Sequence, residues 1–98
     1  MMEDKEIHLI CVKYNIKKYK INNGLVDVDD DVNLINKELT ELPLNFGEIR
    51  GHFKCGGNQL TTLKGCPIRI DGNFSCSGNE LTKLDYLPEF IGGDFYCR

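Results

Sequence analysis

Apolar residues recur at a fixed spacing of 21 positions in the second half of the chain. The segment GHFKCGGNQLTTLKGCPIRID begins at Gly51, GNFSCSGNELTKLDYLPEFIG begins at Gly72, and GDFYCR begins at Gly93. Phe and Cys keep their columns in all three segments, at Phe53, Phe74 and Phe95 and at Cys55, Cys76 and Cys97. A repeat of this length is typical of solenoids, in which similar units stack on one another.

Further residues recur at the same spacing, and together they give the bounds of the repeat array. An Asn, two Leu, a Pro and an Ile recur in both complete copies, at Asn58 and Asn79, Leu60 and Leu81, Leu63 and Leu84, Pro67 and Pro88, and Ile70 and Ile91. A degenerate copy precedes them, with apolar residues at Val32, Leu34, Leu39, Leu42 and Ile49. We therefore expect an array over residues 30–98, with coils 30–50, 51–71 and 72–92 and a terminal strand 93–98.

Each coil has a strand and a looser return segment. Phe74 and Cys76 lie two residues apart, which is the period of a strand with one buried face. Leu81 and Leu84 are expected to point inward from the return segment, and stacked coils bury these side chains against one another in a short parallel sheet. Asn58 and Asn79 follow a tight turn, and their side chains are expected to form a buried ladder that satisfies backbone groups.

The segment before the array is predicted to cover its first coil. Ile7, Ile10, Cys11 and Tyr14 follow the spacing of an amphipathic helix over residues 3–19, with Asp4 as the expected N-cap. Asn22-Asn23-Gly24 predicts a turn between two strands. Residues 1–29 are thus predicted to form an N-terminal cap of helix and hairpin, because the end coil of a solenoid otherwise exposes its core.

These motifs resemble known repeat families. Phe74-x-Cys76-x-x-Asn79-x-Leu81 is similar to the L-x-L-x-x-N-x-L core of leucine-rich repeats, and LTEL, LTTL and LTKL resemble the short repeats of bacterial effector proteins. The wider Gly-x-Phe-x-Cys-x-x-Asn-x-Leu-Thr-x-Leu pattern is closer still to repeat proteins encoded by tailed bacteriophages. The resemblance implies an α+β repeat fold, in which a capping helix and hairpin precede a short leucine-rich-repeat-like β-solenoid. It also implies a phage product that acts on a host protein.

Charge and composition argue against several classes of function and location. A formal net charge of -3 argues against binding nucleic acid or anionic membranes by bulk electrostatic attraction. The chain has no run of about 20 apolar residues, and its MMEDKE start does not resemble a signal peptide. Five cysteines, an odd number, cannot all be paired within one chain. We expect a soluble, reduced protein of the cytoplasm.

Candidate metal and catalytic sites are weak. Asp27, Asp29, Asp31 and Glu38 have the spacing of calcium ligands in an EF-hand loop, but Val32 stands where that loop needs Gly. The Cys columns lack the paired spacing of zinc ligands and are expected to be core residues. Because no nucleophile, base or phosphate-binding loop recurs, we predict no enzyme activity, metal or cofactor.

The outward side chains of the strands are the predicted partner-binding face. They alternate with the buried Phe and Cys columns and comprise Asp31, Asn33, His52, Lys54, Asn73, Ser75, Asp94 and Tyr96. Any solvent-facing strand is polar, so polarity alone does not distinguish a binding surface from an ordinary one. We expect them to bind a protein, since repeat scaffolds commonly present such surfaces.

Two alternatives involve other residues. The last strand, with Asp94, Phe95, Tyr96 and Cys97, leaves an unpaired edge that favours homodimerisation or docking on a partner. The acidic patch of Asp27, Asp29, Asp30 and Asp31 suggests a mimic of nucleic-acid phosphates for a DNA- or RNA-binding protein. A structural or self-assembling module therefore remains an alternative, as does an acidic decoy.

Overall fold

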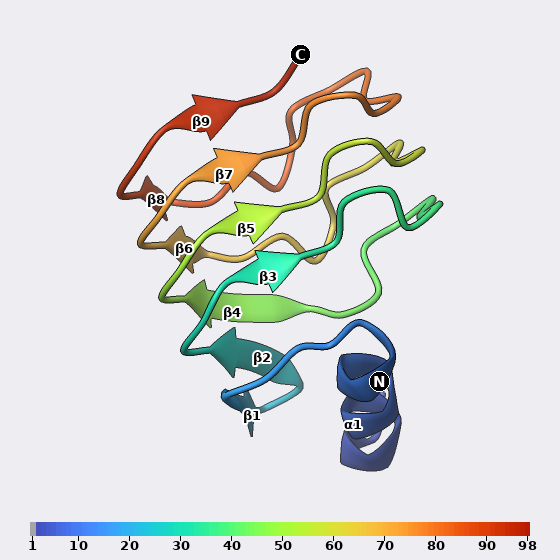
Figure 1. The fold of residues 1–98 in the computed structure, drawn as a ribbon, viewed down its shortest axis with the longest axis vertical. Helices are drawn as coiled ribbons and strands as arrows, with labels where there is room; N and C mark the ends of the chain where they lie inside the picture. The colour runs from blue at the N-terminus through green and yellow to red at the C-terminus, as the bar shows by residue number, and fades with distance from the viewer. Residues whose placement is uncertain (1) are drawn as a thin grey trace.

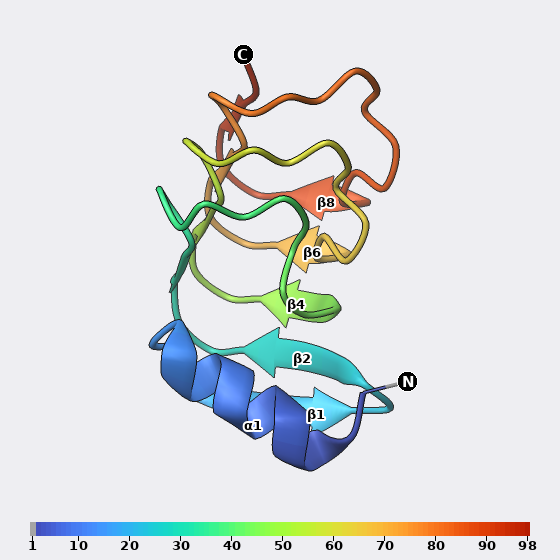
Figure 2. The ribbon, with the colours of Figure 1, turned by 90° about the vertical axis from the view of Figure 1, so that its right-hand side faces the viewer.

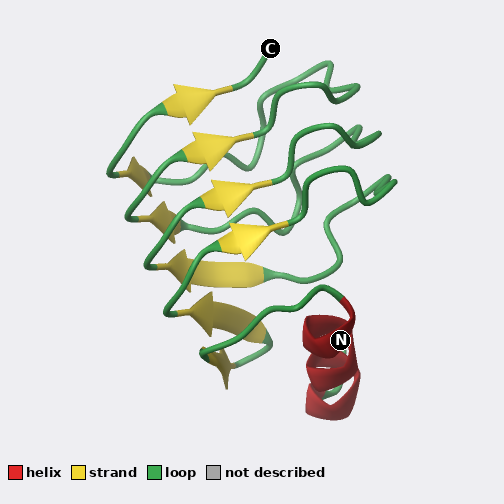
Figure 3. Ribbon diagram, in the orientation of Figure 1, coloured by secondary structure: helices red, strands yellow, loops and turns green. Residues whose placement is uncertain are grey.

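The computed structural model describes residues 2–98, which wind into coils stacked along the longest axis (Figure 1). Helix α1 (Asp4–Lys13) comes first, followed by the antiparallel hairpin of β1 (Tyr19–Asn22) and β2 (Leu25–Val28). The remaining strands are short: β3 (Val32–Asn33), β4 (Phe46–Ile49), β5 (Phe53–Lys54), β6 (Arg69–Ile70), β7 (Phe74–Ser75), β8 (Phe90–Ile91) and β9 (Phe95–Tyr96). Loops make up most of each coil (Figure 3). The predicted α+β solenoid with an N-terminal helix is confirmed.

Two sheets form two walls of the solenoid. One wall has the strand order β3-β5-β7-β9, and all its neighbours are parallel. The other has the order β1-β2-β4-β6-β8, with only the β1–β2 pair antiparallel. The repeat pattern predicted the first wall but not the second, in which Ile49, Ile70 and Ile91 pair in register. Both walls keep the 21-residue spacing, since Phe53 pairs with Phe74 as Glu48 pairs with Arg69.

The helix is shorter than the sequence predicted. It ends at Lys13 instead of residue 19, because Asn15 and Lys18 adopt the left-handed backbone conformation, with φ of 57° and 55°. Its N-cap is Glu3, whose side chain makes no capping hydrogen bond, so the expected cap at Asp4 was wrong. The helix nevertheless covers the first coil and the hairpin (Figure 2), and it buries Ile7 and Cys11 in the core.

Stacked aromatic rings fill the centre of the core. The ring centroids of Phe46 and Phe53 are 5.0 Å apart, those of Phe53 and Phe74 6.0 Å, and those of Phe74 and Phe95 5.2 Å. Edge-to-face and offset arrangements at such separations add to the free energy gained by burying each ring. The predicted column of Phe over Phe is confirmed, and Phe46 on the second wall extends it.

The Asn ladder also forms. The Asn58 Oδ1 accepts hydrogen bonds from the backbone N–H groups of Lys37 (2.8 Å) and Leu39 (3.1 Å), while its Nδ2 donates to the carbonyl of Leu34. Asn79 repeats the arrangement one coil later, where its Oδ1 accepts from Leu60 N–H at 3.0 Å. Each Asn thus ties its own turn to the coil before it. Asn58 is buried and Asn79 only partly so.

Burial decreases sharply in the last coil. Leu84 was expected to point inward like Leu63, yet it is 50% exposed whereas Leu63 is 1% exposed. Phe95 is 41% exposed, while Phe53 and Phe74 are fully buried. The reason is positional, because no further coil of the described chain lies beyond the last one (Figure 1).

Candidate binding surfaces

Half of the predicted partner-binding residues link neighbouring coils. Asp31 Oδ1 accepts a hydrogen bond from His52 N–H (2.7 Å), His52 Nδ1 accepts from Asn73 N–H (2.8 Å), and Asn73 Oδ1 accepts from Asp94 N–H (2.8 Å). We call Asp31, His52, Asn73 and Asp94 the acceptor column. Its residue types differ, but each of the first three places an acceptor under the backbone of the next coil. His52 must therefore carry its ring proton on Nε2.

The other four predicted residues form a separate row, which we call the display row: Asn33, Lys54, Ser75 and Tyr96. They pair in register across β3, β5, β7 and β9, one residue from each coil. Asn33 and Lys54 are exposed, and Tyr96 is 50% exposed. The Tyr96 hydroxyl donates to Asp94 Oδ2 at 3.0 Å, and this hydrogen bond to a carboxylate raises the pKa of Tyr96. The display row is the part of the predicted face that takes little part in stacking the coils.

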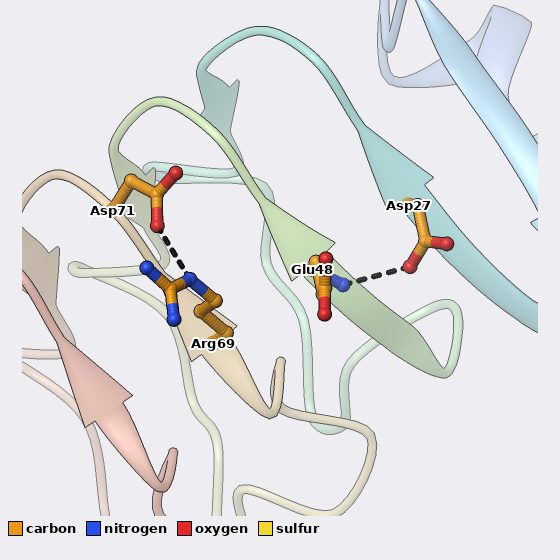
Figure 4. Close-up of polar contacts among 4 residues, drawn as sticks. All are labelled: Asp27, Glu48, Arg69 and Asp71. Carbon is orange, nitrogen blue, oxygen red and sulfur yellow. Dashed lines mark hydrogen bonds and ion pairs between the residues drawn. The ribbon is translucent and has the colours of Figure 1, made fainter.

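The outer face of the second wall carries charges that the sequence analysis missed. Glu48 pairs in register with Arg69, whose Nε lies 2.8 Å from Asp71 Oδ1 (Figure 4). The Arg69 guanidinium also lies 4.3 Å from the centre of the Phe90 ring. Charged residues flanking Ile49 and Ile70 were the available signal, since alternation around a buried column indicates a strand. Acidic and basic residues alternate along this wall, and Arg69 and Asp71 form an ion pair.

The acidic patch is exposed at Asp29, Asp30 and Asp31, and three of its carboxylates accept backbone or side-chain hydrogen bonds. Asp27 Oδ1 accepts a hydrogen bond from Glu48 N–H at 2.8 Å (Figure 4), and Asp31 belongs to the acceptor column. Asp30 Oδ1 accepts from Asp31 N–H at 2.8 Å. Basic residues accompany the acids in a shallow hollow of about 340 Å³ on this side, lined in part by Lys18, Lys20, Asp27, Asp29 and Arg50. The carboxylates of Asp27 and Asp31 thus help to join the coils.

The EF-hand-like spacing corresponds to a strand and its flanks. Val32 is buried in β3 and pairs with Phe53, so residues 27–38 do not wrap around a common centre. Within residues 2–98, no three His, Cys, Asp or Glu side chains are grouped so that they could hold a metal ion.

Burial keeps the thiols of Cys55, Cys66 and Cys76 protonated. Burial raises the pKa of Cys55 to about 12, and burial also raises the pKa values of Cys66 and Cys76. A thiol is a poor nucleophile, because the thiolate is the reactive form. The two imidazoles lie elsewhere, since His8 Nδ1 is 2.5 Å from Tyr19 OH and His52 belongs to the acceptor column. This arrangement does not activate a nucleophile.

The last coil forms a second candidate surface, the open end, which comprises Leu84, Tyr86, Leu87 and Phe95. Each of these side chains is more than a third exposed. A pocket of about 260 Å³ lies beside them, lined by Cys76, Asn79, Leu81, Leu84 and Cys97 among others. The predicted edge residues Asp94, Phe95, Tyr96 and Cys97 run along the border of this surface, on and beside terminal strand β9.

Comparison with known proteins finds no matching family model, curated protein or solved structure. No helix within the part of the chain that the structure describes is long and apolar enough to cross a membrane.

Proposed function

We propose that this protein is a non-catalytic protein-binding module, and that its partner contacts the display row of Asn33, Lys54, Ser75 and Tyr96. The observation that carries the proposal is that two sets of side chains on the outer face of the first wall make different contacts. The side chains of the acceptor column bond to the next coil, whereas those of the neighbouring display row make their hydrogen bonds within their own coil, at Asn33 and Tyr96. A row of this kind can change to suit a partner without altering the fold.

The backbone beneath the display row is held in place by regular hydrogen bonds. Val32 N–H donates to His52 O at 2.8 Å, Phe53 N–H to Asn73 O at 2.9 Å, and Phe74 N–H to Asp94 O at 2.9 Å. Strands in a sheet lie about 4.8 Å apart, so the four side chains extend over roughly 15 Å. A fixed row limits the conformational entropy that is lost on binding.

The chemistry of the row favours a polar partner with an acidic group. Lys54 supplies a positive charge, Asn33 and Ser75 supply hydrogen-bonding groups, and Tyr96 adds an aromatic ring at the end of the row. Tyrosine is enriched among the residues that dominate binding energy at interfaces. The protonated thiols and dispersed histidines support a role without catalysis.

The resemblance to phage-encoded repeat proteins extends this proposal to the source of the partner. We propose a host bacterial protein in the cytoplasm, such as an enzyme or a component of a defence system that the module inhibits. Mimicry of nucleic acid is less well supported, because Asp27, Asp30 and Asp31 accept backbone hydrogen bonds and basic side chains lie near the patch.

Affinity capture from a bacterial lysate tests the display row. The bait proteins are the wild type, Lys54→Glu, Asn33→Arg and a control, Lys64→Glu, which makes the same charge change as Lys54→Glu on an exposed return segment. We expect a stoichiometric protein bound by the wild type and by Lys64→Glu. Lys54→Glu should reduce its recovery roughly tenfold, as loss of a central interface residue does. Equal recovery with all four baits would assign binding to another surface.

A further inference from the structure

The acceptor column contains one side chain of a type that changes its charge near neutral pH. Asp31, His52 and Asn73 each accept a backbone N–H of the next coil, at 2.7, 2.8 and 2.8 Å. A carboxylate remains an acceptor down to about pH 4, and a side-chain amide does not titrate. A histidine takes up a proton near pH 6.5 and then carries a hydrogen on both ring nitrogens. The three hydrogen bonds are therefore alike at neutral pH and differ in mild acid.

The imidazole of His52 fits closely between two coils. A Cβ atom built on Gly72 would lie 2.5 Å from the ring Nδ1 and 2.8 Å from the carbonyl oxygen of Gly51, so this approach requires glycine at position 72. The backbone on both sides of the contact is held by hydrogen bonds. Gly72 N–H donates to Gly51 O at 3.0 Å, and Phe53 N–H donates to Asn73 O at 2.9 Å. The Asn73 N–H therefore cannot turn to another acceptor without breaking the ladder between these coils.

We infer that protonation of His52 breaks its hydrogen bond with Asn73 and weakens the junction between coils 51–71 and 72–92 in mild acid. On the protonated ring, Nδ1 carries a hydrogen that points at the Asn73 N–H, so that two donors face each other. Turning the ring by 180° places a C–H group there, which cannot accept either. The Asn73 N–H then loses its partner at a half-buried position, and a loss of this kind costs stability.

Charged groups near the ring only partly offset this loss. The titratable and charged residues on the segments that adjoin the ring are Asp30, Asp31, Arg50, Lys54, Asp71 and Asp94. Asp31 is tied directly to His52, because its Oδ1 accepts the backbone N–H of that residue. A protonated imidazole is attracted to this carboxylate, but Asp31 is exposed and an exposed ion pair contributes little. The lost backbone hydrogen bond is the larger effect, so protonation weakens the junction.

The effect is confined to one junction of the solenoid. The junction before it uses the Asp31 carboxylate, and the junction after it uses the Asn73 amide, so both keep their hydrogen bonds between about pH 7 and about pH 5. Only the neutral imidazole of His52 can accept, so the unfolded chain binds more protons here than the folded chain. The stability that this hydrogen bond contributes is therefore complete above about pH 7 and is lost as the pH falls.

Urea unfolding at about pH 7 and about pH 5.5 tests the inference, since histidines titrate in this interval and most carboxylates do not. The unfolding equilibrium constant of the wild type should rise roughly fivefold between the two conditions. His52→Asn supplies an amide oxygen, as Asn73 does one coil later, and should remove most of this rise. The other of the two histidines provides the control, His8→Asn, which should keep the rise. His8 bonds to the Tyr19 hydroxyl, which can donate or accept.

A titration of the wild type by NMR keeps the test independent of how the variants fold. The amide proton of Asn73 should shift with the same midpoint as the ring of His52, whereas the amide of Asp94, bonded to the Asn73 side chain, should not. An Asn73 amide that stays unchanged while the ring takes up its proton would overturn the inference. An equal rise in the unfolding constant for His52→Asn and the wild type would do the same. Both measurements use the protein alone, so they are independent of the display-row proposal.

Discussion

At the N-terminal end of the solenoid, α1 and the β1–β2 hairpin cover the first coil, and Ile7 and Cys11 are buried against it. At the C-terminal end, the last coil has the repeat columns of its neighbours but no covering element within the described chain. Val32 in the first coil is consequently buried, whereas Phe95 in the same column is 41% exposed. The burial of a repeat residue is thus decided by the coil or cap beside it, and not by its column alone.

The largest expected difference between the two regions concerns the Phe column. Phe74→Ala should lower the free energy of unfolding by about 3–5 kcal/mol, because the side chain is fully buried between two rings. Phe95→Ala should lower it by only about 1–2 kcal/mol, since that ring is partly exposed and stacks on one neighbour. Urea unfolding followed by circular dichroism at low protein concentration measures both.

Equal losses for the two Phe variants would show that the last coil is as well covered as the interior. Phe74→Leu provides a milder substitution if Phe74→Ala does not fold.

Substitutions in the Asn ladder should also cost more stability in the interior than near the last coil, with a smaller difference between the two positions. Asn58→Ala removes an acceptor for two backbone N–H groups and a donor to buried carbonyls, at a cost of about 2–4 kcal/mol. Asn79→Ala should cost about half as much, because its surroundings are partly exposed and water can replace the lost bonds. Gln59→Ala, at an exposed position in the same turn, serves as the control in the same urea titration.

The smallest expected effect is a decrease in the free energy of unfolding at alkaline pH, caused by the buried thiol of Cys55. Folding raises the pKa of Cys55 from 9.0 to about 12, so the unfolded chain loses this proton at a lower pH than the folded chain. The contribution of Cys55 is complete below about pH 9 and is lost as the pH rises toward 12. The loss should be about 1 kcal/mol per pH unit for this group.

Unfolding in urea at about pH 8 and about pH 10 measures this dependence. Cys55→Ala should show a smaller decrease between the two conditions than the wild type. An identical decrease would indicate that other groups determine the alkaline sensitivity.

The regular part of the fold could be predicted because each core column repeats the same residue type. Phe53, Phe74 and Phe95 define the register of the first wall directly. The second wall was missed because β4 and β6 each bury one Ile between charged residues, and β8 places Ile91 between Phe90 and Gly92. These patterns are too short to distinguish from a loop. The helix was predicted too long because single-residue backbone changes, such as that at Asn15, leave little trace in apolar spacing.

The binding surfaces were harder to predict than the core. The acceptor column uses Asp, His and Asn at equivalent positions, so its shared hydrogen bond is hidden by differences in residue type. The sequence therefore grouped this column with the display row, although the two make different contacts. Leu84 and Leu63 are the same residue type at the same repeat position, so the sequence gives no sign that Leu84 is exposed. Its exposure depends on whether another coil lies beside it.

The constant spacing of the two walls has a consequence for how the chain folds. The strand pairs of the first wall join positions 21 residues apart, from Val32 with Phe53 to Phe74 with Phe95. Adding each coil therefore closes a loop of the same length and costs nearly the same entropy. Growth from the capped end meets a series of equal barriers, and each coil formed becomes the template for the next. We expect the last described coil, which has a template on one side only, to open first when the protein unfolds.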